Sequence, residues 1–444
     1  MAIITPSAKS HERVTGRWVR DIEFRTPRDW IVYYIKVIFG TPIPYLMWSY
    51  VIVTYMSRAG SEIAAWSCAL LTLIYIAADR FSSSREIQLF PIGGDIFLLG
   101  YTLVCLGSAF MSESPVESLF NLNGARWVVL LYLMTYCWEL FPGLNRVFAL
   151  LFFASFGACL YGIWQHFTGV DLVRNAELPS APLPSTLFFI PRGLFSTPEI
   201  FGTLIAMAVP FPIAAYLCAH RKDPRLKRYV PLALGLVLLL GVFWTYRPGL
   251  WAAALTGVLA AAFMQPRRLL GVLLAITVFF AAVTTLSYDS TESLLSSVQQ
   301  SEESRAEKQR AQINSQVELW QSNTWLGAGS EAEKVANYDP GTGNVYFHVL
   351  AQSGLLGLGF YLLFILGLLL GTYRIFSEVP ASHYWHRVFV VGALASQIVF
   401  HVSGLFWTTL NEAIAVNLFV LIVSATCYLT EHYSRGLVTD DESL

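Results

Sequence analysis

Long apolar runs, separated by short polar connections, fill most of this 444-residue chain. A membrane-spanning helix needs about 20 mostly apolar residues. Only 13% of the residues are charged, against about 25% in soluble proteins. The pattern predicts an all-α polytopic membrane protein with about twelve transmembrane helices. The predicted spans are 43–58, 62–79, 91–111, 126–141, 147–168, 199–219, 229–246, 249–264, 269–287, 344–373, 388–408 and 411–431.

The distribution of Lys and Arg predicts which side of the membrane each loop faces. With the N-terminus in the cytoplasm, most of the 29 basic residues fall on the cytoplasmic side, as the positive-inside rule requires. Both termini are therefore expected in the cytoplasm. Residues 1–42 form a cytoplasmic segment with a basic, aromatic interfacial helix, and residues 432–444 form a tail. Residues 43–431 make one membrane domain, without a linker that would divide it.

Two substantial loops then lie on the non-cytoplasmic side, at about 169–198 and 288–343. The second joins predicted spans nine and ten and is polar, with apolar residues at helical spacing. We expect it to form short helices that lie over the membrane face. It has too few large apolar residues to build its own core, so we expect a mobile cap that rests on the membrane domain.

Arg192 and Arg247 are unusual in so apolar a chain, because arginine keeps its charge and is costly near lipid. Arg247 stands in the sequence TYRPGLW, in a very short turn between two spans. Such arginines often face the protein interior and bind an anion, here a lipid-linked phosphate. The alternative for both is an interfacial arginine that extends toward the headgroups.

Glu199 follows Thr197 and Pro198, which together are typical of a helix start. A carboxylate in the first helical turn is stabilised by the helix dipole, which is one explanation for Glu199. The other is a general base at the external mouth of the membrane.

The segment from 323 onward contains several glycines that allow close backbone approach before a long helix begins. Asn344 lies at the entrance of that helix, and His348 lies about one turn inside it. His348 is a candidate proton acceptor, or else a packed histidine with a hydrogen-bonding role only. No cysteine or histidine spacing indicates a metal site. The net charge of −1 gives no reason to expect nucleic acid as a partner.

Taken in order, these segments resemble the O-antigen ligase and O-antigen polymerase superfamily of bacterial surface polysaccharide assembly. The resemblance covers roughly residues 150 to 375. It is carried by RGLFSTPEIFG at 192–202, TYRPGLW at 245–251, TWLGAG at 324–329 and GNVYFHVLAQSGLLGLG at 343–359. WQHFTGVD also looks like the Gln-x-x-x-Gly segment of this family.

The chain departs from the family pattern at two positions. Gly343 stands where the family has a catalytic-type histidine, and Gln316 stands where an arginine is common. The base would then be His348, Glu199 or another acid. Arg305 or Arg310, in the same loop, could take over the role of the missing arginine.

The resemblance implies a membrane glycosyltransferase of the bacterial inner membrane, with its active site facing the periplasm. It would move a glycan from undecaprenyl diphosphate to a second glycan, as a polymerase, or to a lipid A core sugar, as a ligase. The missing histidine favours polymerase slightly. Transfer would be inverting and would use no cofactor or metal. Glu199 and His348 are the catalytic candidates, and the substrate-binding candidates are Arg192, Arg247, Arg305, Arg310 and Asn344.

Further partners would be the lipid bilayer and, as a candidate, a chain-length regulator. A different class of protein also fits the span pattern: a transporter or flippase of a lipid-linked or anionic solute. Such a carrier should place its ionisable groups near the middle of the membrane.

Overall fold

The computed structural model describes residues 27–82, 94–112, 114–120, 123–139, 144–180, 188–220, 223–265, 268–287, 291–329 and 343–434. Within these ranges the chain is almost wholly helical, with one antiparallel pair of short strands. The prediction of an all-α membrane protein is therefore confirmed. The elements up to the strands are α2 Pro27–Gly40, α3 Pro42–Thr54, α4 Arg58–Ser82, α5 Asp95–Met111, α6 Pro115–Phe120, α7 Asn123–Glu139, α8 Leu144–Thr168, β1 Val170–Asp171 and β2 Ala176–Glu177.

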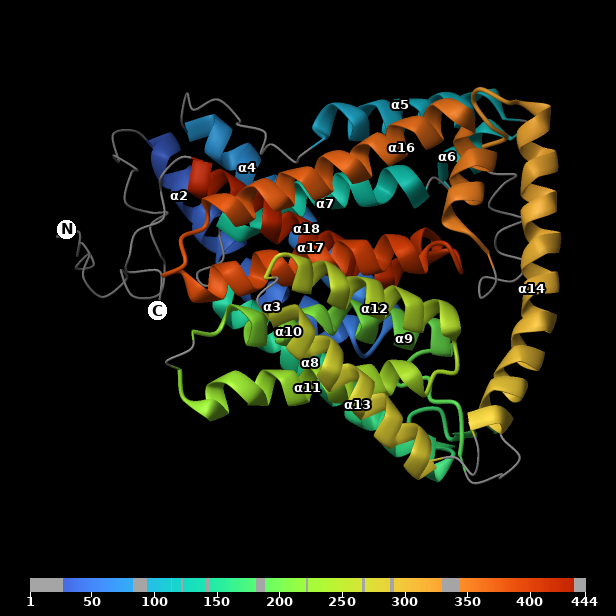
Figure 1. Cartoon of the computed structure of the whole chain (residues 1–444). Helices are drawn as coiled ribbons and strands as arrows, with labels where there is room; N and C mark the ends of the chain where they lie inside the picture. Colours follow the sequence, from blue (N-terminus) through green and yellow to red (C-terminus); the bar gives the residue numbers. More distant parts are fainter. Residues whose placement is uncertain are drawn as a thin grey trace.

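The second half of the chain contains the polar helix α14 and the longest described helix, α16. Its elements are α9 Pro198–Ala208, α10 Pro210–Cys218, α11 Arg225–Phe243, α12 Pro248–Phe263, α13 Leu269–Ser287, α14 Thr291–Ser322, α16 Val345–Glu378, α17 Tyr384–Ser403, the 3₁₀ helix η3 Thr409–Asn411 and α18 Ala413–Ser434. Most of these helices lie side by side as a bundle, and α14 crosses one end of that bundle (Figure 1).

Seven helical stretches of the described chain are long and apolar enough to cross a membrane. They are Ile31–Thr54, Arg58–Ala78, Arg146–Thr168, Pro198–Cys218, Val345–Glu378, Tyr384–Ser403 and Ala413–Tyr433. Asp95–Met111, Arg228–Phe243 and Pro248–Phe263 are shorter apolar helices. Each predicted span overlaps a helix, but the count of twelve and the sidedness of the loops stay predictions.

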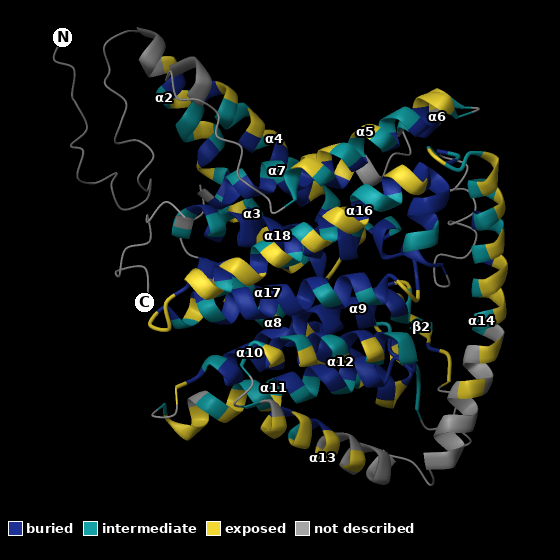
Figure 2. Cartoon of the chain, turned by 45° about the horizontal axis from the view of Figure 1, so that its top comes forward, coloured by how far each residue is buried: buried dark blue, intermediate teal, exposed yellow. Residues whose placement is uncertain are grey.

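The centre of the bundle is formed by α9, α10 and α17. Residues 199–217 are all buried, and α17 is buried along most of its length, as the dark blue ribbons of Figure 2 show. The outer helices instead expose large apolar side chains, such as Leu270 and Leu274 of α13 and Leu366 and Leu370 of α16. Exposed leucines in rows are unfavourable in water and are expected where a helix faces lipid.

The first candidate membrane span begins earlier than the sequence predicts. Of the segment 1–42, residues 1–26 lie outside the described chain, so the interfacial helix is described only from Pro27 onward. A break at Thr41 separates α2 from α3. Together the two helices make the candidate span Ile31–Thr54. This candidate span begins before residue 43, and the boundary between the interfacial segment and the first transmembrane helix stays a prediction.

The expectation of several short helices in the long loop was wrong, because α14 is a single helix of 32 residues. The segment 291–322 contains no Gly or Pro and is rich in Glu and Gln, which are good helix formers. Residues 288–290 and 330–342 of this loop lie outside the described chain. The idea of a mobile cap stays a prediction.

Helix α16 changes direction at Gly354, whose backbone has φ +65° and ψ −167°. The short part before the kink is paired with the turn 323–329. Ala328 N donates to Ala351 O at 2.7 Å, and Gly329 N donates to Gln352 O at 3.1 Å. A Cβ on Gly327 would lie 2.5 Å from the backbone carbon of Gln352. The predicted close backbone approach at this glycine-rich turn is therefore confirmed.

We expect Gly354→Ala to destabilise the protein by about 2–4 kcal/mol, because the new Cβ adds a steric clash to an unfavourable φ. That Cβ would lie 2.2 Å from the backbone oxygen of Trp325. The melting temperature of the purified protein should fall by about 5 °C. Gly359→Ala is the matched control, because a Cβ there meets nothing within 4 Å. Equal melting temperatures for the two variants would contradict this account of the kink.

Candidate functional site

Glu199 stands in the first turn of α9, where the predicted helix start is confirmed. Thr197 is the N-cap with extended φ −134°, and its hydroxyl accepts a hydrogen bond from Ile200 N at 3.4 Å. Pro198 is the first helical residue. The Glu199 side chain is only 6% exposed. A carboxylate this buried needs a positive partner to remain charged.

Arg247 supplies one of those partners from the turn between α11 and α12. Its Nε donates to Glu199 Oε1 at 2.7 Å. Tyr246 has φ +54°, an uncommon conformation for a residue with a Cβ, and it turns the chain directly before Arg247. The turn is held by aromatic packing, since Trp244 stacks on His166 with ring centroids 4.3 Å apart. Arg247 is thus presented by a rigid turn.

Arg305 supplies the second partner from α14. Its Nη1 donates to the same oxygen, Glu199 Oε1, at 3.0 Å. Three segments far apart in sequence therefore meet at one carboxylate, and all three residues are candidates predicted from the sequence. Arg310 is exposed and makes no hydrogen bond or ion pair within the described part of the chain. A substrate-binding role for Arg310 stays a prediction.

The ion-pair group of Glu199, Arg247 and Arg305 carries one excess positive charge. Both guanidinium groups use Oε1, and Oε2 makes no hydrogen bond or ion pair to any described residue. Arg247 donates through Nε alone, so its two terminal nitrogens donate no hydrogen bond in the described structure. The group thus offers guanidinium donors to an anion and a carboxylate oxygen to a proton.

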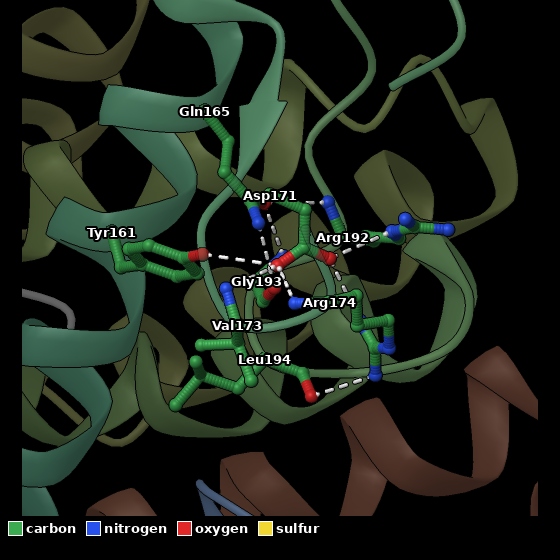
Figure 3. A network of polar contacts seen from close by, with 8 residues as sticks. All are labelled: Tyr161, Gln165, Asp171, Val173, Arg174, Arg192, Gly193 and Leu194. Atoms are coloured by element: carbon green, nitrogen blue, oxygen red, sulfur yellow. Dashed lines mark hydrogen bonds and ion pairs between the residues drawn. The ribbon is translucent and has the colours of Figure 1, made fainter. Parts of the chain in front are cut away.

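Arg192 belongs to a second network, which is centred on Asp171 (Figure 3). Arg192 Nε donates to Asp171 Oδ2 at 3.2 Å, and Arg174 Nη1 donates to the same oxygen at 3.0 Å. Tyr161 donates its hydroxyl to Oδ1 at 3.1 Å. Burial alone would raise the pKa of Asp171, but the hydrogen bonds and charge of Arg174, with the Tyr161 hydroxyl, hold that pKa below its ordinary value.

The backbone around Arg192 is held by Gln165. Its Oε1 accepts from the backbone N of Arg192 at 3.1 Å and of Gly193 at 2.8 Å, and its Nε2 donates to Gly193 O at 2.8 Å. Sequence reasoning had not assigned roles to Gln165 or Asp171. The signal was present in WQHFTGVD, whose Gln and Asp both fall in this network.

Asn344 is the N-cap of α16, as its place at the helix entrance suggests. Its Oδ1 accepts from Tyr346 N at 2.9 Å and from Phe347 N at 3.3 Å, while Nδ2 donates to Leu405 O at 2.9 Å. These contacts explain Asn344 as a structural residue. A direct role in substrate binding stays a prediction.

His348 lies inside the short first part of α16 and is 2% exposed. Its Nδ1 has no hydrogen-bond partner within the described structure, and no described contact links it to Glu199. Gly343, the position where the family has a histidine, is tightly packed. A Cβ there would lie 2.3 Å from Thr408 Cγ2, so a side chain would require a shift of the neighbouring segment.

One face of α14 is polar and lies against the ends of the other helices. Gln309 Nε2 donates to Gly343 O and Leu405 O, each at 3.3 Å. Gln316, where the family often has arginine, is 1% exposed and neither its Nε2 nor its Oε1 has a partner in the described structure. This face carries Arg305, Gln309, Gln312 and Gln316, spaced three or four residues apart. Of these residues, Arg305 contacts Glu199, and Gln309 joins α14 to the segments at Gly343 and Leu405.

Comparison with known proteins confirms the resemblance. Residues 232–362 match the family described as O-antigen ligase. The matched range contains Arg247, Arg305, Asn344 and His348, but neither Arg192 nor Glu199. A search of curated protein sequences finds no match. A solved chain from a study titled "Structural coordination of polymerization and crosslinking by a peptidoglycan synthase complex" is similar with a TM-score of 0.40 and 15% identity, over 78% of this chain and 98% of that chain.

Proposed function

We propose that this membrane protein, which carries an O-antigen ligase domain at residues 232–362, transfers a glycan from undecaprenyl diphosphate to an acceptor glycan at the periplasmic face of a bacterial inner membrane. The observation that carries the proposal is the ion-pair group of Glu199, Arg247 and Arg305. It combines cationic donors for a diphosphate with a carboxylate that can act as a base.

The arginines would stabilise the leaving group. When the bond between the anomeric carbon and the diphosphate oxygen breaks, negative charge develops on the diphosphate. Arg247 can donate from its two terminal nitrogens to two oxygens of the diphosphate without breaking its contact with Glu199. Arg192, held by Asp171, can bind a second part of the same substrate. We propose metal-independent transfer, because these arginines already supply the positive charge.

Glu199 is our first candidate for the general base. Its Oε2 would take the proton of the attacking acceptor hydroxyl while the acceptor oxygen forms the new bond to the anomeric carbon. A direct displacement of this kind inverts the anomeric configuration. His348 is the second candidate, and it would need to gain access to the acceptor from its buried position.

The direct test is incubation of the purified protein in lipid nanodiscs with lipid-linked oligosaccharide, followed by separation of the products by length. A ladder of products, which we expect, indicates a polymerase. A single shift that requires added lipid A core indicates a ligase. No product with either acceptor, together with movement of the lipid-linked substrate across the bilayer, would contradict the proposal and favour a flippase.

We expect Asp171→Asn to lower kcat/KM for the donor by about 10²-fold, since a misplaced substrate-binding group has effects of that size. The amide keeps the shape of the side chain but loses the charge that holds Arg192 and Arg174. Initial rates at varied donor concentration should show a higher KM for the donor and little change in KM for the acceptor.

Glu177→Gln in the paired strand is the matched control, because it removes one carboxylate from the exposed side of the same hairpin. It should keep the parent rates. Unchanged donor KM in Asp171→Asn would mean that Arg192 does not depend on this network for substrate binding.

A further inference from the structure

The hairpin that carries Asp171 exposes apolar side chains at its turn. Strands β1 and β2 pair Val170 with Glu177 and Asp171 with Ala176, so residues 172–175 form the turn. Within it Leu172 is 66% exposed and Val173 is 63% exposed. Two neighbouring apolar side chains at the tip of a turn are unfavourable in water, so this tip is better suited to an apolar surrounding.

Hydrogen bonds hold the turn in shape, so the exposure of its tip is built into the fold. Asp171 is fully buried, and its Oδ1 accepts from Val173 N at 3.1 Å and from Arg174 N at 3.3 Å (Figure 3). Arg174 also donates from Nη2 to Leu194 O at 2.9 Å. With the carboxylate of Asp171 held inward, Leu172 and Val173 are presented outward together.

The hairpin follows directly on a candidate membrane span with an exposed apolar stripe. That span, Arg146–Thr168 of α8, exposes Phe153, Leu160, Trp164 and Phe167. These positions are seven, four and three residues apart, which places them on one face of the helix. In a spanning helix at the outside of a bundle such a stripe faces lipid.

Tyr161 indicates the level of the hairpin along α8. Its hydroxyl donates to Asp171 Oδ1 at 3.1 Å, although Tyr161 lies seven residues before the end of the span at Thr168. At about 1.5 Å per residue this is about 10 Å back along the helix axis. The candidate span has 23 residues, or about 35 Å, against a hydrocarbon core of about 30 Å. The folded-back tip therefore lies near the boundary between headgroups and acyl chains.

The residues around the tip are of the types that suit this boundary. Trp164 stacks on Tyr161 with ring centroids 5.8 Å apart and is partly exposed. Tryptophan and tyrosine are enriched where lipid meets water. Arg174 can keep its aliphatic stem beside the tip and its guanidinium among the headgroups. Glu177, by contrast, is exposed at the open base of the hairpin. The hairpin thus has an apolar tip and a charged base.

We propose that the tip of this hairpin, Leu172 and Val173, inserts into the bilayer leaflet beside Trp164 and Phe167. The occupant of this apolar surface is phospholipid, and the insertion holds the Asp171 network at headgroup level. Lipid insertion does not depend on the proposed function. Its consequence for catalysis rests on that function: the two arginines paired with Asp171 lie at the depth of a lipid-linked diphosphate.

The test measures the depth of spin labels on the full-length protein in nanodiscs of phosphatidylethanolamine and phosphatidylglycerol, without lipid-linked donor. Labels are attached at Val173→Cys and, as the matched control, at Glu177→Cys on the same hairpin. Both variants carry Cys218→Ser, because the other five cysteines are buried. The label at 173 should be more accessible to oxygen than to an aqueous nickel chelate, and the label at 177 should show the reverse order.

Replacement of the other tip residue should move the label. Leu172→Gln in the Val173→Cys protein should shift the label toward water, because it removes an apolar side chain without adding a charge, whereas Leu172→Phe should leave the label in lipid. Leu172 is largely exposed, so both variants should fold like the parent. In transfer assays Leu172→Gln alone should raise the donor KM by about 3–10-fold and leave the acceptor KM unchanged.

A label at 173 that is as accessible to the nickel chelate as the label at 177 would overturn the insertion. Shielding of the label at 173 from both reagents would assign the tip to a protein surface, such as a second copy of this chain, and would also overturn it. So would lipid contact that appears only after lipid-linked donor is added, since the donor tail would then be the occupant.

Two further outcomes separate the insertion from the proposed function. Lipid contact of the label at 173, with no glycan transfer by the parent protein, would support the insertion and overturn the proposed function. Transfer with an unchanged donor KM in Leu172→Gln, although the label has moved to water, would overturn the link between insertion and donor binding.

Discussion

Arg247→Ala is expected to lower the rate of glycan transfer by at least about 10³-fold, which is typical when a cation that stabilises a phosphate leaving group is removed. Arg247 reaches Glu199 Oε1 through Nε at 2.7 Å and presents its remaining nitrogens from a rigid, aromatic turn. Alanine removes the guanidinium, whereas Arg305 still pairs with Glu199. The loss should therefore appear in the rate and not in the amount of folded protein.

Arg247→Lys should restore little activity, because an ammonium group cannot hold Glu199 and two diphosphate oxygens with a planar fork. Arg374→Ala is the matched control. Arg374 pairs with Glu378 near the far end of α16 and its side chain is 81% exposed. Initial rates should be compared at equal amounts of monodisperse protein. A near-parental rate of transfer by Arg247→Ala would show that the ion-pair group takes no part in the mechanism.

The membrane architecture was largely predictable because a bilayer imposes a length and a composition on each spanning helix. Every predicted span overlaps a helix, and α9 begins at the Thr197–Pro198 signal. The first span and α14 were less predictable. The break between α2 and α3 lies inside the first candidate span, so it does not mark the end of an interfacial helix. In α14, the helix-forming residues gave one long helix where periodic apolar residues had suggested several.

Several residues of the two arginine networks could be picked out from the sequence, but their contacts could not, and their roles in catalysis and binding stay predictions. Arginine and glutamate in an apolar chain are conspicuous, so Arg192, Arg247 and Glu199 could be found from the sequence. The pairing of Glu199 with Arg305 joins positions 106 residues apart and follows from how α14 crosses the bundle. Asp171 was missed although WQHFTGVD contains it, because the sequence does not show that Arg192, 21 residues further on, folds back onto this carboxylate. The place of Asn344 directly before the helix is typical of an N-cap residue, which is the role that it has in the structure.

Glu199→Gln separates a role in proton transfer from a role in holding the arginines. The amide oxygen can still accept from Arg247 or Arg305, but it cannot take a proton from an acceptor hydroxyl. If Glu199 is the base, kcat should fall by about 10²–10⁴-fold. The donor KM should stay equal or fall, because the removed negative charge no longer competes with the diphosphate for the arginines. A purely structural carboxylate would instead raise the donor KM.

Glu318→Gln is the matched control for Glu199→Gln, because Glu318 is exposed on α14. His348→Ala should be measured in parallel, since His348 is the other candidate base. Full rates in Glu199→Gln with a large loss in His348→Ala would move the proton transfer to the buried first part of α16. If both variants keep full rates, the base lies elsewhere. The next residues to replace are His166 and the buried His401 of α17, and then Asp339, which lies outside the described residues. Formate added to Glu199→Ala gives a further test: a small carboxylate that enters beside Arg247 and Arg305 should restore part of the rate if the carboxylate of Glu199 takes part in transfer.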